Sequence, residues 1–333
     1  MPAEALLLRG VSHRFGNLEA LSGVDLRVDE GEIYGFLGLN GAGKTTLIRL
    51  ILGLIRPRTG KIRVLGAPVK GRPPEPFLEV GVLLEDFAAP PYLTGWEQLY
   101  LQAKLFGKSG KLARRSADHW LARVKLESKA LVKVRNYSLG MRRRLGIACA
   151  LVADPRLVIL DEPTNGLDPQ GISDLRSLIL ELREISGTTF FLSSHILSEV
   201  EQLCERVGIL HLGRMVLEGN VGDLTGREQN RHNLRASPGY RAHEILKAAP
   251  WCKGVAWREP GDPRSSSAPA PASDHPPELL QVEVKDEDVP KMVRELVAKG
   301  VDVHEVTPSR ESLESVFHRA IRGQEPGAIE EAA

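Results

Sequence analysis

Residues Gly38-Leu39-Asn40-Gly41-Ala42-Gly43-Lys44-Thr45 match the phosphate-binding pattern G-x-x-x-x-G-K-[ST]. Residues 32–37, directly before them, form a short apolar run that is typical of a strand. Apolar residues follow at the spacing of one helix face: Leu47, Leu50, Ile51 and Leu54. A strand, a glycine loop and a helix in this order place backbone N–H groups around phosphate oxygens at a helix N-terminus. The alternative is a glycine-rich turn that matches by chance, and these flanks disfavour it. The stretch therefore predicts a nucleoside triphosphate site.

Two side chains of this loop have their own predicted roles. Lys44 would reach the β- and γ-phosphates of the nucleotide, and the Thr45 hydroxyl would bind Mg²⁺. The remaining loop residues would act through their backbone.

The composition is ordinary for a soluble globular protein of two domains. The 44 basic and 43 acidic residues give a net charge of +1, so no global electrostatic attraction to nucleic acid is expected. Cys149, Cys204 and Cys252 lie far apart, which favours reduced, buried thiols in the cytosol over a disulfide or metal site. The first residues lack the features of a signal peptide, and no stretch approaches the ~20 apolar residues that span a bilayer.

Strand-like and helix-like segments alternate from residue 5 to about 220, which predicts an α/β fold with helices covering a sheet. Short apolar runs at 157–160, 188–192 and 207–210 have the composition of buried parallel strands. An amphipathic helix between them is marked by Leu175, Leu178, Ile179 and Leu182. The first domain is placed at 1–225, with a helical subdomain at about 87–153.

The segment from 230 to 323 predicts a separate accessory α+β domain. Strands are expected at 233–236, 254–257, 279–284 and 301–306, with helices at 241–249 and 289–297. This βαββαβ order is that of a ferredoxin-like fold. A flexible loop is expected at 261–277, a last helix after the start signal Thr307-Pro308, and a disordered tail at 324–333.

Carboxylates and a histidine follow two of the predicted strands. Asp161 and Glu162 end the apolar run at 157–160, where Asp161 can face Mg²⁺ and Glu162 can polarise the attacking water. A capped turn is the alternative for Asp-Glu-Pro, and the strand before it favours catalysis. His195 ends the next strand and can hold Glu162 and the water in line with the γ-phosphate.

A second anion site is predicted at Ser138 and Gly140, because a helix follows them. One chain seldom uses two distant phosphate sites on one nucleotide. Two copies facing head to tail would bring each Ser138 to the γ-phosphate of the other copy. The sequence therefore predicts a nucleotide-sandwich homodimer.

Taken together, these motifs resemble the nucleotide-binding subunit of an ATP-binding cassette (ABC) transporter over residues 5 to about 220. The Walker A motif is Gly38 to Thr45 followed by Thr46, and the Walker B motif is 157–161 followed by Glu162. The signature motif is 138–142, the D-loop is 165–168 with Asp168, and the switch histidine is His195. Phe15 matches the aromatic residue that stacks on adenine in this family. The resemblance implies a P-loop NTPase core with a RecA-like sheet, and ATP and Mg²⁺ as cofactors.

Several residues depart from the family pattern, and these departures favour one branch of the family. Leu139 and Met141 replace a glycine and the glutamine of the usual S-G-G-Q signature, and Leu39 replaces a proline of the loop. Glu85 stands where the Q-loop glutamine is expected and could take a Mg²⁺ position. This combination is similar to the exporter branch linked to resistance to bacitracin and other drugs. That branch implies an integral membrane permease as partner, bound near Glu85 and residues 87–106. It also implies a cytoplasmic subunit that is peripheral at the inner face of the cell membrane.

The sequence also offers alternatives from other classes of protein. A soluble ABC ATPase that acts on ribosomes or DNA would usually carry two cassettes or long heptad repeats, and neither is visible. A regulator that binds nucleotide without hydrolysing it would not need Glu162 and His195. The run Arg142-Arg143-Arg144 is interpreted as a solvated helix face rather than a nucleic-acid site. The accessory domain is interpreted as a dimerisation or stability element, with a sensor that gates the ATPase as the alternative.

Overall fold

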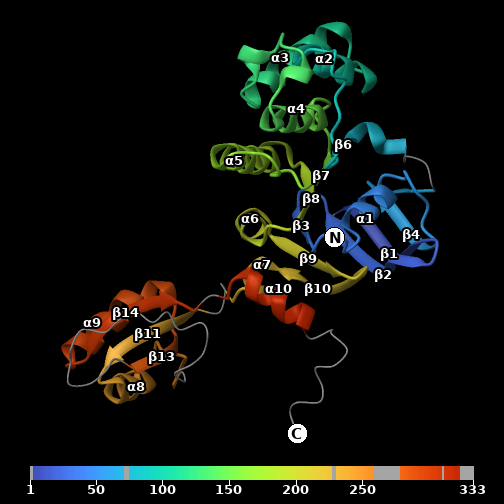
Figure 1. The fold of residues 1–333 in the computed structure, drawn as a ribbon. Helices are drawn as coiled ribbons and strands as arrows, with labels where there is room; N and C mark the ends of the chain where they lie inside the picture. Colours follow the sequence, from blue (N-terminus) through green and yellow to red (C-terminus); the bar gives the residue numbers. More distant parts are fainter. Residues whose placement is uncertain (1–2, 71–74, 227–229, 258–277, 310, 323–333) are drawn as a thin grey trace. The chain divides into compact units, whose positions relative to one another are not determined.

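The computed structural model describes residues 3–70, 75–226, 230–257, 278–309 and 311–322. The chain forms two compact units (Figure 1). The N-terminal unit runs to Gly219 and also includes the end of the last helix from Phe317, while the C-terminal unit is Asn220–Val316. The predicted loop at 261–277 and the predicted tail at 324–333 lie outside the described residues.

A six-stranded sheet is the centre of the N-terminal unit, with the strand order β10-β9-β3-β8-β7-β6. Its strands are β3 (Ile33–Leu37), β6 (Val80–Leu83), β7 (Leu157–Asp161), β8 (Thr189–Ser194), β9 (Arg206–His211) and β10 (Arg214–Asn220). The pairs β6–β7, β7–β8, β8–β3 and β3–β9 are parallel. Every residue of β3, β7 and β8 is buried, as expected for parallel strands covered on both faces. The predicted parallel α/β sheet is confirmed.

A second sheet in this unit was not predicted from the alternation of strands and helices. It has the order β2-β1-β4-β5, formed by β1 (Glu4–Phe15), β2 (Leu18–Asp29), β4 (Thr59–Val64) and β5 (Ala67–Pro68). Its pairs are antiparallel. Helix α1 (Lys44–Ile51) packs into a core shared by both sheets, where Leu47 and Leu50 join Leu6 and Phe191. The predicted helix face was wrong at its end, because α1 stops at Ile51 and Leu54 is exposed.

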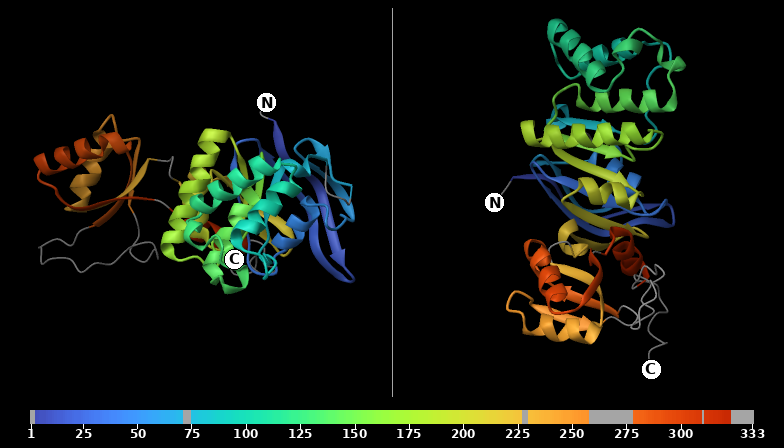
Figure 2. Two further views of the ribbon diagram at one scale, coloured as in Figure 1. Left: turned by 90° about the horizontal axis from the view of Figure 1, so that it is seen from above. Right: turned by 90° about the vertical axis from the view of Figure 1, so that its left-hand side faces the viewer.

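Helices between β6 and β7 form the predicted helical segment, which stacks at one end of this unit in the right-hand view of Figure 2. They are α2 (Gly95–Leu105), α3 (Gly110–Arg123) and α4 (Leu139–Leu151), with single 3₁₀ turns at 127–129 and 134–136. Thr94 and Glu97 start α2 with a capping box, and Ser109 caps α3. Helix α5 (Pro169–Ser186) follows β7, and α6 (Leu197–Leu203) follows β8. None of the helices in the described residues is long and apolar enough to cross a bilayer.

The C-terminal unit has the predicted βαββαβ order after the short helix α7 (Val221–Leu224). Its elements are β11 (Arg231–Ser237), α8 (Gly239–Ala248), β12 (Gly254–Trp257), β13 (Glu278–Glu283), α9 (Val289–Ala298) and β14 (Asp302–Pro308). The strand order is β12-β13-β11-β14, and the pairs are antiparallel. Leu234 and Leu280 of the sheet pack with Leu246 of α8 and Met292 of α9, so both helices cover one face.

The predicted start of the last helix at Thr307-Pro308 was wrong. Both residues belong to β14, where Pro308 is opposite His232, and helix α10 (Leu313–Arg322) begins later. A proline is tolerated there because β14 is an edge strand, so no partner needs its missing N–H group.

The close approach of α4 to β6 depends on Gly81. A Cβ atom at this position would overlap the backbone carbonyl oxygen of Ala150 in α4. We expect Gly81→Ala to lower the free energy of unfolding by about 1–3 kcal/mol through overpacking, measured by denaturant titration. The control is Gly110→Ala, where the added carbon would lie 3.7 Å from the Tyr100 hydroxyl. Equal stability of the two variants would contradict this packing.

Candidate active site

The phosphate-binding loop connects β3 to α1, and its last glycine holds a conformation that other residues rarely adopt. Gly43 is the N-cap of α1 with φ of 112°, and a Cβ atom there would lie 2.7 Å from the carbonyl oxygen of Ala20. No side chain caps the first turn of α1. The N–H groups of that turn are therefore available to an anion, as the sequence pattern requires.

Lys44 is buried at the start of α1 and links the loop to the end of β7. Its Nζ donates a hydrogen bond to the Gly38 carbonyl oxygen at 2.7 Å and lies 3.2 Å from Glu162 Oε1. The second contact is an ion pair without hydrogen-bond geometry, so Glu162 Oε1 is buried with no hydrogen-bond partner among the described residues. Buried oxygens of this kind usually have a partner, which marks the atom as one that a water or ligand would satisfy.

Thr45 and Asp161 present two oxygen atoms side by side. Thr45 Oγ1 donates to Asp161 Oδ2 at 3.1 Å, and Ser193 Oγ donates to Asp161 Oδ1. A hydroxyl and a carboxylate suit Mg²⁺, which is usually held by one or two protein ligands together with phosphates and water. No group of three or more His, Cys, Asp or Glu side chains that could hold a metal occurs in the described part of the chain. The residues present thus fit a Mg²⁺ ion that ATP would help to bind.

Glu162 and His195 meet because β7 and β8 pair in parallel, with Asp161 opposite Ser193. His195 Nδ1 lies 2.7 Å from Glu162 Oε2, and the His195 backbone N–H donates to the same oxygen at 3.4 Å. Glu162 is 4% exposed and has φ of 49°, an unusual value for a residue with a side chain. Backbone strain of this kind is common at functional sites.

The structure thus brings together five predicted site residues: Lys44, Thr45, Asp161, Glu162 and His195. Other predicted residues have different surroundings. Ser138 caps α4 by accepting a hydrogen bond from the Met141 N–H, and Asp168 caps α5. Phe15 is 47% exposed at the end of β1 and has an edge contact with His13. Glu85 follows β6 with an exposed side chain.

The signature stretch also packs against the D-loop. Leu139 and Gly140 both lie close to Gly166, so the side chain that departs from the usual signature fills the space beside this glycine. Helix α4 begins at Leu139, directly after its N-cap Ser138.

Arg143 is a site residue that the sequence analysis missed. We expected the run Arg142-Arg143-Arg144 to be a solvated helix face, but Arg143 is only 5% exposed. Its guanidinium donates to five backbone carbonyl oxygens, which belong to Leu84, Glu85, Asp161, Glu162 and Pro163. Burial lowers the pKa of Arg143, and the nearby carboxylates oppose this effect. One side chain of α4 therefore fixes the two backbone segments at the ends of β6 and β7.

We expect Arg143→Met to lower the free energy of unfolding by about 3 kcal/mol, because several buried carbonyl oxygens lose their donor. Arg142→Met is the matched control, since within the described residues the Arg142 side chain makes a single hydrogen bond, to the Tyr137 carbonyl oxygen. It should cost no more than about 1 kcal/mol. Denaturant unfolding of both variants provides the measurement, and equal losses would show that the five contacts of Arg143 contribute little.

Comparisons with known proteins indicate the family of this chain. The family model described as ABC transporter matches residues 21–165. The uncharacterized ABC transporter ATP-binding protein YdbJ of Bacillus subtilis is 37% identical over 96% of this chain and 96% of its own length. The bacitracin transport ATP-binding protein BcrA of Bacillus licheniformis is 37% identical over 93% of this chain and 94% of its own length. The daunorubicin resistance ATP-binding protein DrrA3 of Streptomyces coeruleorubidus is 34% identical over 95% and 96%.

Solved structures match about two thirds of the chain. An ATP-binding subunit of an ABC transporter has a TM-score of 0.61 and 32% identity, covering 66% of this chain and 91% of its own. The ATP-binding cassette MJ0796, in a dimeric post-hydrolysis state with ADP and Pi, has a TM-score of 0.60 and 26% identity, covering 65% and 98%. The chain has the P-loop cassette fold and matches these relatives over almost their full length. The chain belongs to the ABC transporter family and is an ATP-binding subunit.

Proposed function

We propose that this chain hydrolyses ATP and thereby powers a separate membrane permease. Together, the two subunits would form an exporter. The observation that carries the proposal is the contact series Lys44–Glu162–His195, in which Lys44 and Glu162 are buried, next to the Thr45–Asp161 pair. Glu162 is the general base that polarises the attacking water through Oε1, which has no hydrogen-bond partner within the described residues. His195 orients Glu162 through the other oxygen, and Lys44 binds the phosphates.

Mg²⁺ would be held by Thr45 and Asp161, with Glu85 as a further ligand. When bound, the ion neutralises charge on the phosphates. Ser193 keeps Asp161 oriented, because it donates to the Asp161 oxygen that Thr45 does not contact. Glu85 adds a negative charge where the family has a glutamine, so we expect activity to depend strongly on Mg²⁺.

Two copies would form each complete active site. In this arrangement Ser138 and Gly140 of one copy bind the γ-phosphate held by the phosphate loop of the other. The N-terminus of α4 supports it, since Ser138 is exposed there and makes no hydrogen bond to Lys44 or Glu162 within the described residues. Asp168 lies at the neighbouring helix start, and Phe15 would stack on adenine. A relative in the family, MJ0796, is dimeric with ADP and Pi.

The proposals of a permease partner and of export are based on the names of the relatives. BcrA is named for bacitracin transport and DrrA3 for daunorubicin resistance, and both match this chain over almost their full length. The permease would bind near Glu85 and the following 87–106 segment, where Tyr92, Leu101 and Leu105 expose apolar surface. The chain would then work in the cytoplasm at the inner face of the membrane, without a nucleic-acid partner.

The accessory domain, proposed at 230–323 beside a cassette domain at 1–225, would support dimerisation or stability. The full-length relatives include this region in their match, whereas the solved cassettes cover about two thirds of the chain.

We expect Glu162→Gln to lower the ATPase kcat by about 10²–10⁴-fold while ATP binding is retained, because only the general base is removed. Steady-state phosphate release and nucleotide titration measure the two effects. The control is Glu184→Gln on the exposed face of α5, which should keep the parental rate. Parental turnover by Glu162→Gln would exclude the assigned role of Glu162.

Mixing two inactive variants tests the shared site. Lys44→Ala and Ser138→Ala damage different halves, so a mixed dimer holds one intact site and one site with both defects. With equal amounts, half of the dimers are mixed, and about a quarter of the parental activity should return if the sites act independently. The control is each variant alone at the same total concentration. No recovery in the mixture would mean that each chain completes its own site.

A further inference from the structure

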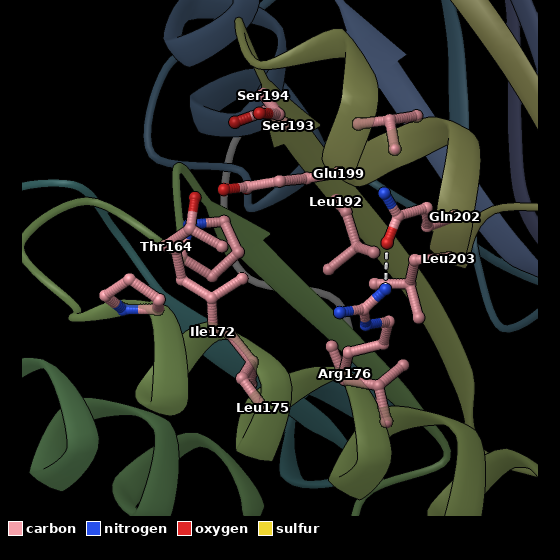
Figure 3. Close-up of a pocket in the computed structure, with 14 residues that line it drawn as sticks. Thr164, Ile172, Leu175, Arg176, Leu192, Ser193, Ser194, Glu199, Gln202 and Leu203 are labelled. Carbon is pink, nitrogen blue, oxygen red and sulfur yellow. Dashed lines mark hydrogen bonds between the residues drawn. The ribbon is translucent and has the colours of Figure 1, made fainter.

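A cavity of about 240 Å³ lies between α5 and α6 against β8 (Figure 3). Its wall is mostly apolar, and the apolar part includes Ile172, Leu175, Ile179, Leu192, Val200 and Leu203. An apolar cavity of about 150 Å³ is enough to hold benzene. This cavity therefore has room for one aromatic ring with a substituent.

The cavity adjoins both catalytic segments without including the phosphate loop. Pro163 and Thr164, which directly follow Glu162, form one part of its wall. Ser193 and Ser194, which directly precede His195, form another. A bound molecule would touch the backbone next to both catalytic side chains, whereas the residues that would bind the nucleotide phosphates lie outside its reach.

The polar groups of the wall indicate what kind of molecule fits. Thr164 Oγ1 is buried and has no hydrogen-bond partner within the described residues, so it can pair with one hydroxyl group. Arg176 donates to Gln202, and the Glu199 carboxylate points to the Thr164 side of the cavity in Figure 3. The two charged side chains have opposite signs, so the wall has no net charge that would favour an ion.

We propose that this cavity binds a compact, uncharged, phenol-like molecule and that its occupancy slows ATP hydrolysis. The ring packs between α5 and α6, and the hydroxyl pairs with Thr164. The bound ring fixes the distance between α6 and the residues that follow β7. The His195 segment, at the start of α6, then cannot adjust to Glu162 as the water attacks. The kinetic part of this proposal rests on the proposed ATPase function, whereas the binding part does not.

Binding is tested with 4-fluorophenol, whose fluorine NMR signal reports occupancy without any turnover. It should bind the wild-type chain about fivefold more tightly than 4-fluorotoluene, which lacks the hydroxyl. Thr164→Val should remove this preference.

Ile172→Trp fills the cavity from α5 and should abolish binding, whereas Leu180→Trp, on an exposed position of α5 outside the wall, should leave it unchanged. Thermal unfolding checks that each variant is folded. Absence of binding at millimolar probe, or equal binding by folded Ile172→Trp, overturns the proposal.

The effect on turnover is tested in the same four proteins. Saturating 4-fluorophenol should lower the wild-type ATPase kcat about fivefold, within the usual range of coupling between two sites, and leave KM for ATP unchanged. Ile172→Trp should be insensitive to the probe, and Leu180→Trp should respond like the wild type. An unchanged wild-type kcat with bound probe overturns the regulatory part. A chain without any ATPase activity would instead refute the proposed function, and the NMR titration would still decide whether the cavity binds the probe.

A second copy of the chain is the other possible occupant of the cavity. The titration is therefore repeated with Glu162→Gln in the presence of ATP and Mg²⁺, which should hold two copies together. The affinity for 4-fluorophenol should stay within about twofold of the nucleotide-free value. Loss of binding under these conditions would show that the partner copy covers the cavity, and would overturn the proposal.

Discussion

The parallel register of β7 and β8 is the constraint on which the site depends. It places Asp161 opposite Ser193, so that the residues just beyond the two strand ends, Glu162 and His195, come within hydrogen-bond distance. The neighbouring strand β3 leads into the phosphate loop, which brings Lys44 to the same edge of the sheet. Ligands of open α/β sheets bind at the carboxyl ends of the strands, and the proposed catalytic residues Lys44, Glu162 and His195 lie there.

Arg143 connects this edge to the helical segment. The conformation of Glu162, with its positive φ, costs free energy and persists only if its surroundings hold it in place. Arg143 contributes by donating to the carbonyl oxygens of Asp161 and Glu162, and it also binds the carbonyl oxygens after β6. A displacement of α4, which follows Ser138, would therefore change the position of Glu162, the proposed general base. Within the proposed mechanism, this guanidinium would couple the binding of a partner copy at Ser138 to hydrolysis at Glu162.

The position of the proposed catalytic residues at one edge of the sheet could be predicted, because each lies next to a local signal, such as a glycine loop or the end of a buried apolar strand. Long-range features could not. The antiparallel sheet pairs β1 with β4, which lie far apart in sequence, and nothing within either strand specifies the partner. The burial of Arg143 depends on carbonyl oxygens from segments about 20 and 60 residues away, so the arginine run looked like a solvated face. Pro308 was misread as a helix start, since the sequence does not reveal that β14 is an edge strand.

The central claim is that Glu162 and His195 act as one catalytic unit, with the histidine working through the carboxylate. A double-mutant cycle on the single-turnover rate of ATP hydrolysis tests it most directly, using Glu162→Gln, His195→Ala and the combined variant. If His195 acts by orienting Glu162, the combined variant should be no slower than Glu162→Gln alone. Losses that multiply, so that the combined variant is slower by the product of the two single effects, would contradict a shared role.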